Sequence, residues 1–273
     1  MNETLIEDWD DAYANGAHIE GAASFPPRWA KAAEAFRASL GARAELDIAY
    51  GPAPRQRLDL FRPGGAERGL VVFIHGGYWR AFDKSLWSWL VAGPLARGWA
   101  VATPSYTLAP EARIAAITAE IGAAVAKGST LVEGPVRLTG HSAGGHLATR
   151  MICEDTPLPA DVLRRVALVV SISGVHDLRP LRRTAMNADL RLDAAEAAAE
   201  SPVLLSPTRG ARLMCWVGAK ERPEFRRQNA LLANIWAGLG AATAAHEEPS
   251  RHHFDVIDAL ADPESALTEA LLG

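Results

Sequence analysis

The hydrophobic positions of this chain fall into short apolar runs separated by longer stretches of mixed character. Eight of the runs end in turn-forming or polar residues, which is typical of strands buried in a sheet. The predicted strands are Leu46–Tyr50, Leu58–Phe61, Leu70–Ile74, Trp99–Thr103, Val136–Thr139, Val166–Ser173, Leu213–Val217 and Ala241–Glu247.

Ala-rich helical stretches separate the later strands. Strands that alternate with helices predict a mostly parallel central sheet with helices on both faces, an α/β fold. The predicted helices are Ser85–Arg97, Glu111–Lys127, Ala143–Glu154, Pro223–Trp236 and a closing helix from about Asp255 to Leu271.

Two segments depart from this alternation. Residues 1–44 are predicted to form an N-terminal helical extension, with a helix over Pro27–Leu40 that ends at Gly41. Residues 177–207 carry Arg-rich and Ala/Glu-rich helical stretches without a strand, and we expect a small cap over the edge of the active site. No repeat or linker interrupts the pattern, so one domain is predicted over residues 1–273.

The composition is that of a globular chain with a large core, since 49% of the residues are hydrophobic and 22% are charged. The formal net charge is −4, and basic residues cluster only in pairs such as Arg182-Arg183 and Arg226-Arg227. Nucleic acid is therefore not an expected partner. A small-molecule substrate is expected, and a homodimer stays open as an alternative to a monomer.

Neither cysteine suggests metal or redox chemistry. Cys153 and Cys215 lie in apolar contexts without metal-ligand spacing, so we predict two buried thiols and no metal site. Residues 1–11 are acidic and lack the features of a signal peptide, and we expect no apolar stretch to reach the roughly 18 residues that span a bilayer. The sequence therefore predicts a cytoplasmic protein without a membrane partner.

The most informative motif is Gly140-His141-Ser142-Ala143-Gly144, between a predicted strand and a predicted helix. In a G-x-S-x-G turn the glycines permit a strained backbone that lifts the serine hydroxyl above the sheet edge. We predict Ser142 as a nucleophile.

A serine hydroxyl is a weak nucleophile, so it needs a nearby base and a third group that orients the base. In this type of site the histidine follows the last strand, where only His252 and His253 lie. We predict His253, next to Phe254, as the general base and His252 as a loop neighbour.

The orienting acid is expected in the loop after the strand that precedes the last one. Glu221 lies there, just past Val217 and before a proline-initiated helix, and is the predicted acid. Asp177, after the previous strand, is the rival, and Glu224 is a more distant alternative.

A second Gly-rich segment, His75–Trp79, follows another predicted strand. Backbone amides held in such a turn can bind the negative charge that develops on a substrate oxygen during acyl transfer. The predicted oxyanion hole comprises the amides around Gly76, Gly77 and Tyr78, together with Ala143. Trp79 and His141 are predicted to belong to the substrate pocket.

With these motifs, His75–Trp79 and Gly140–Leu147, the chain resembles the kynurenine formamidase (arylformamidase) branch of the esterase/lipase α/β-hydrolases. Further similarities are Ser173–Leu178, Ser201-Pro202, and Val217-Gly218 followed by Pro223–Gln228. The resemblance implies an α/β-hydrolase fold and a cofactor-free Ser/acid/His enzyme that hydrolyses the formamide of N-formyl-kynurenine in tryptophan breakdown. This family has Asp before the Pro-Glu-Phe stretch, where this chain has Glu221.

Two other functions stay open from the sequence. The same scaffold serves promiscuous short-chain carboxylesterases, which differ from a formamidase only in substrate. The chain would instead be a non-catalytic ligand-binding protein on the hydrolase scaffold if one of the catalytic groups were missing.

Overall fold

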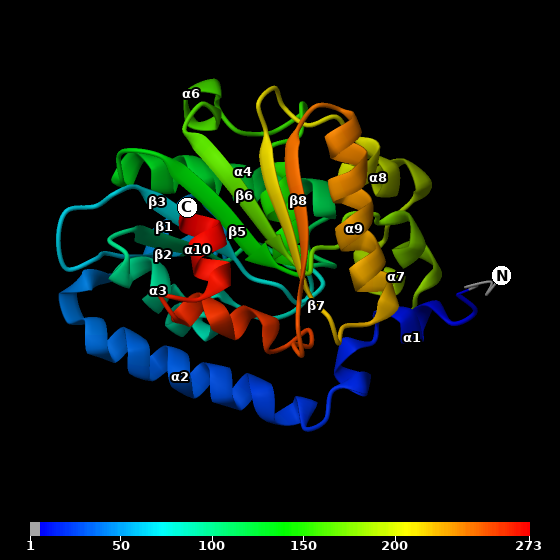
Figure 1. Ribbon diagram of the computed structural model, residues 1–273, viewed down its shortest axis with the longest axis horizontal. Helices are drawn as coiled ribbons and strands as arrows, with labels where there is room; N and C mark the ends of the chain where they lie inside the picture. The colour runs from blue at the N-terminus through cyan, green and yellow to red at the C-terminus, as the bar shows by residue number, and fades with distance from the viewer. Residues whose placement is uncertain (1–5) are drawn as a thin grey trace.

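A computed structural model describes residues 6–273, and its strands form one eight-stranded sheet (Figure 1). The strand order is β1-β2-β4-β3-β5-β6-β7-β8, with β1 and β2 antiparallel to their neighbours and the strands from β4 to β8 parallel. The strands are β1 (Ala44–Ala49), β2 (Arg57–Phe61), β3 (Leu70–Ile74), β4 (Ala100–Pro104), β5 (Val136–His141), β6 (Val166–Ile172), β7 (Arg212–Gly218) and β8 (Ala242–Glu248). The predicted mostly parallel sheet is confirmed.

Each face of the sheet carries its own hydrophobic core. Alternate residues of β3 point to opposite sides, so Leu70, Val72 and Ile74 belong to one core while Val71 and Phe73 belong to the other. Helices α4 (Ile114–Leu131), α5 (Ala143–Arg150) and α9 (Pro223–Gly238) cover the first face. Helices α2 (Phe25–Leu40), α3 (Ala92–Ala96) and α10 (Ala266–Leu272) cover the second, and Figure 1 shows α10 in front of the sheet and α4 behind it.

Two predicted helices are wrong as continuous elements. The closing stretch splits into a 3-10 turn, η8 (Val256–Ala261), and α10, because Pro263 has no N–H and cannot continue a helix. The stretch predicted over Ser85–Arg97 divides into η4 (Lys84–Leu86), η5 (Ser88–Val91) and α3, with Pro94 inside it. Helix α6 (Ala160–Leu163) was not predicted.

Helix α4 corrects one statement drawn from the sequence. Its 18 residues are long and apolar enough to span a membrane by length and composition, so the expectation that no stretch reaches this length is wrong. Half of the helix is buried inside the structure, and Ile117, Ile121 and Val125 pack in the core. The apolar composition of α4 is thus accounted for by packing on the sheet.

The predicted extension consists mostly of short helical elements joined by turns, and residues 1–5 lie outside the described part. Its elements before β1 are α1 (Trp9–Tyr13), η1 (Asn15–His18), η2 (Ala22–Ser24), α2 and η3 (Gly41–Arg43). Helix α2 ends at Gly41, whose φ of 55° suits glycine. Figure 1 shows α1 beside α9, although α9 belongs to the C-terminal part of the sequence.

The segment 177–207 also has the predicted character, with short helical elements between β6 and β7. They are η6 (Arg179–Arg183), α7 (Asn187–Leu190), α8 (Ala194–Ala199) and η7 (Pro202–Leu204). Cys153 and Cys215 are free and buried, as predicted, and burial raises the pKa of each thiol to about 12.

Candidate active site

Ser142 occupies a sharp turn between β5 and α5. Its φ of 57° and ψ of −117° are uncommon for a residue with a side chain, and its amide donates to the Ile172 carbonyl at 2.8 Å. A Cβ at Gly144 would collide with the Ile74 carbonyl, and one at Gly140 would collide with Gly144 itself. Both glycines of the motif are therefore required for the turn to pack against β3.

His253 and Glu221 contact each other although they follow different strands. His253 Nδ1 lies 2.6 Å from Glu221 Oε2, and the two side chains are 5% and 0% exposed. The other carboxylate oxygen, Oε1, accepts from Ser173 Oγ at 2.5 Å and from the Gly218 amide at 2.8 Å. Three neighbours thus set the orientation of the carboxylate, and the carboxylate sets that of the imidazole.

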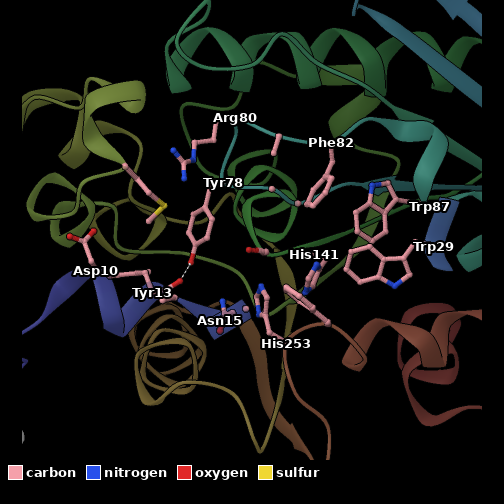
Figure 2. Close-up of a pocket in the computed structure, with 18 residues that line it drawn as sticks. Asp10, Tyr13, Asn15, Trp29, Tyr78, Arg80, Phe82, Trp87, His141 and His253 are labelled. Atoms are coloured by element: carbon pink, nitrogen blue, oxygen red, sulfur yellow. Dashed lines mark hydrogen bonds between the residues drawn. The ribbon is translucent and has the colours of Figure 1, made fainter. Parts of the chain in front are cut away.

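Ser142 and His253 line the same cavity of about 370 Å³ at the carboxyl end of the sheet (Figure 2). Among residues 6–273 no direct hydrogen bond joins the Ser142 hydroxyl to the imidazole. Such bonds are often long without substrate and tighten when substrate binds. The structure therefore brings the predicted nucleophile and base to one cavity. Glu221 contacts the imidazole of His253 through Nδ1.

The rival groups are engaged elsewhere. Both carboxylate oxygens of Asp177 bind Arg179 at 2.9 Å. Glu224 is buried and accepts from the Tyr13 hydroxyl at 2.8 Å. His252 Nδ1 accepts from a neighbouring backbone amide at 3.1 Å and does not line the cavity. Of the three carboxylates considered, only Glu221 contacts His253.

The loop after β3 packs directly on the serine turn. A Cβ at Gly76 would lie 2.7 Å from the His141 carbonyl and 3.1 Å from Ser142 Cβ. Gly77 and Tyr78 have φ values of 111° and 50°, so their N–H groups do not alternate in direction as those of a strand do. Within the described chain, the amides of Gly77, Tyr78 and Ala143 donate to no protein acceptor. These free donors can serve an oxyanion.

His75, at the start of this loop, is fixed by contacts with Tyr106. Its ring stacks on Tyr106 with centroids 4.4 Å apart, and the Tyr106 hydroxyl donates to the His75 carbonyl at 3.0 Å. Burial lowers the pKa of His75 to about 4, so the ring is neutral at pH 7. The contact positions the backbone that leads into the loop.

A family model described as BD-FAE matches residues 58–207, more than half of the chain. The chain belongs to the BD-FAE family. The matched region contains both the loop after β3 and the Ser142 turn, whereas Glu221 and His253 lie beyond its end.

Known relatives of this BD-FAE family member include enzymes. Kynurenine formamidase from Danio rerio is 27% identical over 237 residues, which cover 83% of this chain and 80% of the relative. A crystal structure of a candidate thioesterase from Silicibacter sp. TM1040 is 50% identical, has a TM-score of 0.93, and covers 97% of this chain and 99% of its own. Esterase B from Lactobacillus rhamnosis is 22% identical with a TM-score of 0.64, covering 91% of each chain.

These similarities confirm the α/β-hydrolase fold and the resemblance to kynurenine formamidases. The relatives that it matches along most of their length include a kynurenine formamidase and a candidate thioesterase, which supports an enzyme of the hydrolase class. Among residues 6–273 no group of three or more His, Cys, Asp or Glu side chains could hold a metal ion.

The cavity walls differ in part from those predicted. Tyr78 and His141 line the cavity, and burial holds the pKa of His141 well below its usual range. Trp79 does not line it, because the loop turns this side chain inward, where it is fully buried and packs on His146. The prediction of Trp79 as a pocket wall is wrong.

Several lining residues were missed from the sequence. Some belong to the N-terminal extension, including one aromatic side chain of α2, and others follow the loop after β3 or belong to the segment 177–207. The missed side chains include Asp10, Tyr13, Asn15, Trp29, Arg80, Phe82, Trp87 and Met186. No periodic or motif pattern marks them, since they reach the cavity only through the tertiary fold.

Proposed function

We propose that this BD-FAE family member is a serine hydrolase that cleaves an aryl formamide of the N-formyl-kynurenine type through an acyl-enzyme. One observation carries the proposal: Ser142, His253 and the loop after β3 with its free amides line a single cavity, and Glu221 contacts His253 from outside it. The similarity to kynurenine formamidase over most of both chains supports the choice of substrate.

In the proposed reaction, Ser142 Oγ attacks the formyl carbon and its proton passes to His253 Nε2. The amides of the loop and of Ala143 bind the oxyanion. The C–N bond then breaks, and His253 returns the proton to the departing amine. Water attacks the formyl ester in the same manner, which releases formate and regenerates Ser142.

Glu221 does not exchange a proton in this scheme. It accepts the Nδ1 hydrogen of His253 and so leaves Nε2 free to accept the serine proton. The hydrogen bonds from Ser173 and Gly218 hold Glu221 in that role.

The test compares purified wild-type protein with the Ser142→Ala variant on N-formyl-kynurenine. We expect wild type to release kynurenine and to react with a fluorophosphonate probe, and Ser142→Ala to lose both. The matched control is Ser39→Ala, which changes an exposed serine of α2 and should preserve both activities. Turnover that survives in Ser142→Ala contradicts the serine mechanism.

Ester or thioester hydrolysis is the second candidate, favoured by the 50% identity to the candidate thioesterase. Short 4-nitrophenyl esters and an acyl thioester should be assayed beside the formamide. Hydrolysis of these compounds without hydrolysis of N-formyl-kynurenine would reject the formamidase proposal and leave the serine mechanism intact.

A further inference from the structure

The N-terminal segment forms one wall of the active-site cavity. Tyr13 anchors it, because the Tyr13 hydroxyl donates to Glu224 and accepts from Gln228, both at 2.8 Å. Asp10 accepts from the Ala185 amide at 2.7 Å, and the Tyr78 hydroxyl donates to the Tyr13 carbonyl at 2.6 Å. These bonds tie the segment to α9, to the region between β6 and β7, and to the oxyanion loop.

Asn15 follows this anchor and lines the cavity with Ser142 and His253. Figure 2 labels Asn15 and His253 among the side chains that line this cavity. Asn15 is only 6% exposed, yet neither its Oδ1 nor its Nδ2 has a hydrogen-bond partner within residues 6–273. One nearby polar group is the Tyr78 hydroxyl: burial raises the pKa of Tyr78, and a weaker interaction with the Asn15 side chain lowers it. The hydroxyl hydrogen goes to the Tyr13 carbonyl, so the Tyr78 oxygen can serve only Nδ2 as an acceptor, and Oδ1 is left without a protein donor within residues 6–273.

A buried amide without a partner destabilises a fold, so such groups are rare and call for an explanation. Here the amide borders a cavity rather than packed protein, and a bound molecule can therefore supply the missing partners. An amide side chain presents one acceptor and one donor group side by side. It is complementary to a ligand that carries both an N–H and a carbonyl oxygen.

We propose that Asn15 is a specificity-determining residue that binds the scissile amide of the substrate and so favours formamides over esters. This inference rests on the proposed function. Asn15 Oδ1 accepts the N–H of the formamide, and Nδ2 donates to a carbonyl oxygen of the leaving group. The ester analogue has no N–H, so it leaves the buried oxygen of Asn15 unpaired.

Asn15 lines the same cavity as His253, which suits this role. His253 delivers its proton to the departing nitrogen, so that nitrogen lies in the cavity that Asn15 also lines. The hydrogen already present on that nitrogen needs an acceptor once the substrate fills the cavity.

The test uses two substrates that differ only in the scissile atom, 4-nitroformanilide and 4-nitrophenyl formate, with spontaneous hydrolysis subtracted. In Asn15→Leu we expect kcat/KM to fall by about 10-fold or more for the anilide and by less than about 3-fold for the ester. Asn15→Leu should unfold at the same temperature as wild type or higher, because it removes an unpaired buried amide. Asn15→Ala is the second variant and should show the same selective loss.

Asp11→Asn is the matched control for docking of the segment. Asp11 does not line this cavity, and its carboxylate binds Arg222 and His18. Weaker docking should lower kcat/KM for both substrates alike, whereas loss of the Asn15 amide should lower kcat/KM selectively for the anilide. An equal effect of Asn15→Leu on both substrates, or no effect on either, overturns the inference while the formamidase proposal stands. Wild-type protein that cleaves the ester but not the anilide overturns both.

Discussion

Replacing Glu221 with glutamine should inactivate the enzyme by imposing the wrong tautomer on His253. In wild type, Oε1 accepts two hydrogen bonds, from Ser173 Oγ and from the Gly218 amide, while Oε2 faces His253 Nδ1. In Glu221→Gln the carbonyl oxygen must take the Oε1 position, because an NH₂ group cannot accept from a backbone N–H. The NH₂ group then donates to Nδ1, and the ring proton moves to Nε2.

The size of the effect follows from this change. With its proton on Nε2, His253 has no lone pair on the nitrogen that faces Ser142, because the remaining lone pair is on Nδ1 and faces residue 221. Base catalysis is therefore lost. The equivalent acid-to-amide change in a serine protease lowers kcat by about 10⁴-fold, or roughly 5 kcal/mol of activation free energy, and we expect a similar loss. Because Glu221 does not line the cavity, KM should change by less than about 3-fold.

Steady-state kinetics on any substrate that wild type hydrolyses will test this expectation, and thermal unfolding will show that the variant is folded. Asp177→Asn is the matched control, since it makes the same chemical change at a carboxylate that binds Arg179 rather than His253. A Glu221→Gln variant within about 10-fold of wild-type kcat, or a comparable loss in Asp177→Asn, would refute the assignment of the acid.

Two further predictions concern the loop and the stability of the fold. Gly76→Ala should lower kcat by about 100-fold or more, because its methyl group would lie 2.7 Å from the His141 carbonyl and displace the oxyanion donors. Gly64→Ala, which meets nothing within 4 Å, should leave the kinetics unchanged. Burial lowers the pKa of His176 to about 3, so the stability due to its neutral form is complete above pH 6.5 and declines as the pH falls toward 3. In His176→Gln the pH dependence of the unfolding free energy between pH 4 and 6 should therefore be shallower by about 1.4 kcal/mol per unit, and an unchanged slope would contradict the buried neutral state.

The parts of the fold that depend on local rules were predictable from the sequence. Strand β3 is buried along its whole length, so its residues form a continuous apolar run with clear ends. The serine turn was predictable because Gly140 and Gly144 have no room for a Cβ. The closing helix was not, because one proline divides a stretch whose hydrophobic periodicity favours a single helix.

Side-chain directions within irregular segments could not be predicted. Tyr78 and Trp79 are adjacent and both have positive φ, yet one lines the cavity and the other is turned into the core. Such a division depends on loop torsions that neither composition nor spacing encodes. Glu221 was easier to select, because strand order places its loop beside the loop that carries His253.

The groups around the cavity come from three regions of the chain with different roles in the proposed reaction. The BD-FAE match over residues 58–207 includes Ser142 and the loop amides, and the C-terminal strands add Glu221 and His253. Asn15 comes from outside both regions, on a segment held by hydrogen bonds from Tyr13 and its neighbours and by packing of Ala12 and Tyr13 in the core. A change in that segment leaves the serine, imidazole and carboxylate in place while altering the wall that faces the leaving group. Under the proposed role of Asn15, substrate preference changes without any change in the residues that perform the chemistry, so membership of the BD-FAE family does not by itself decide between a formamide and an ester.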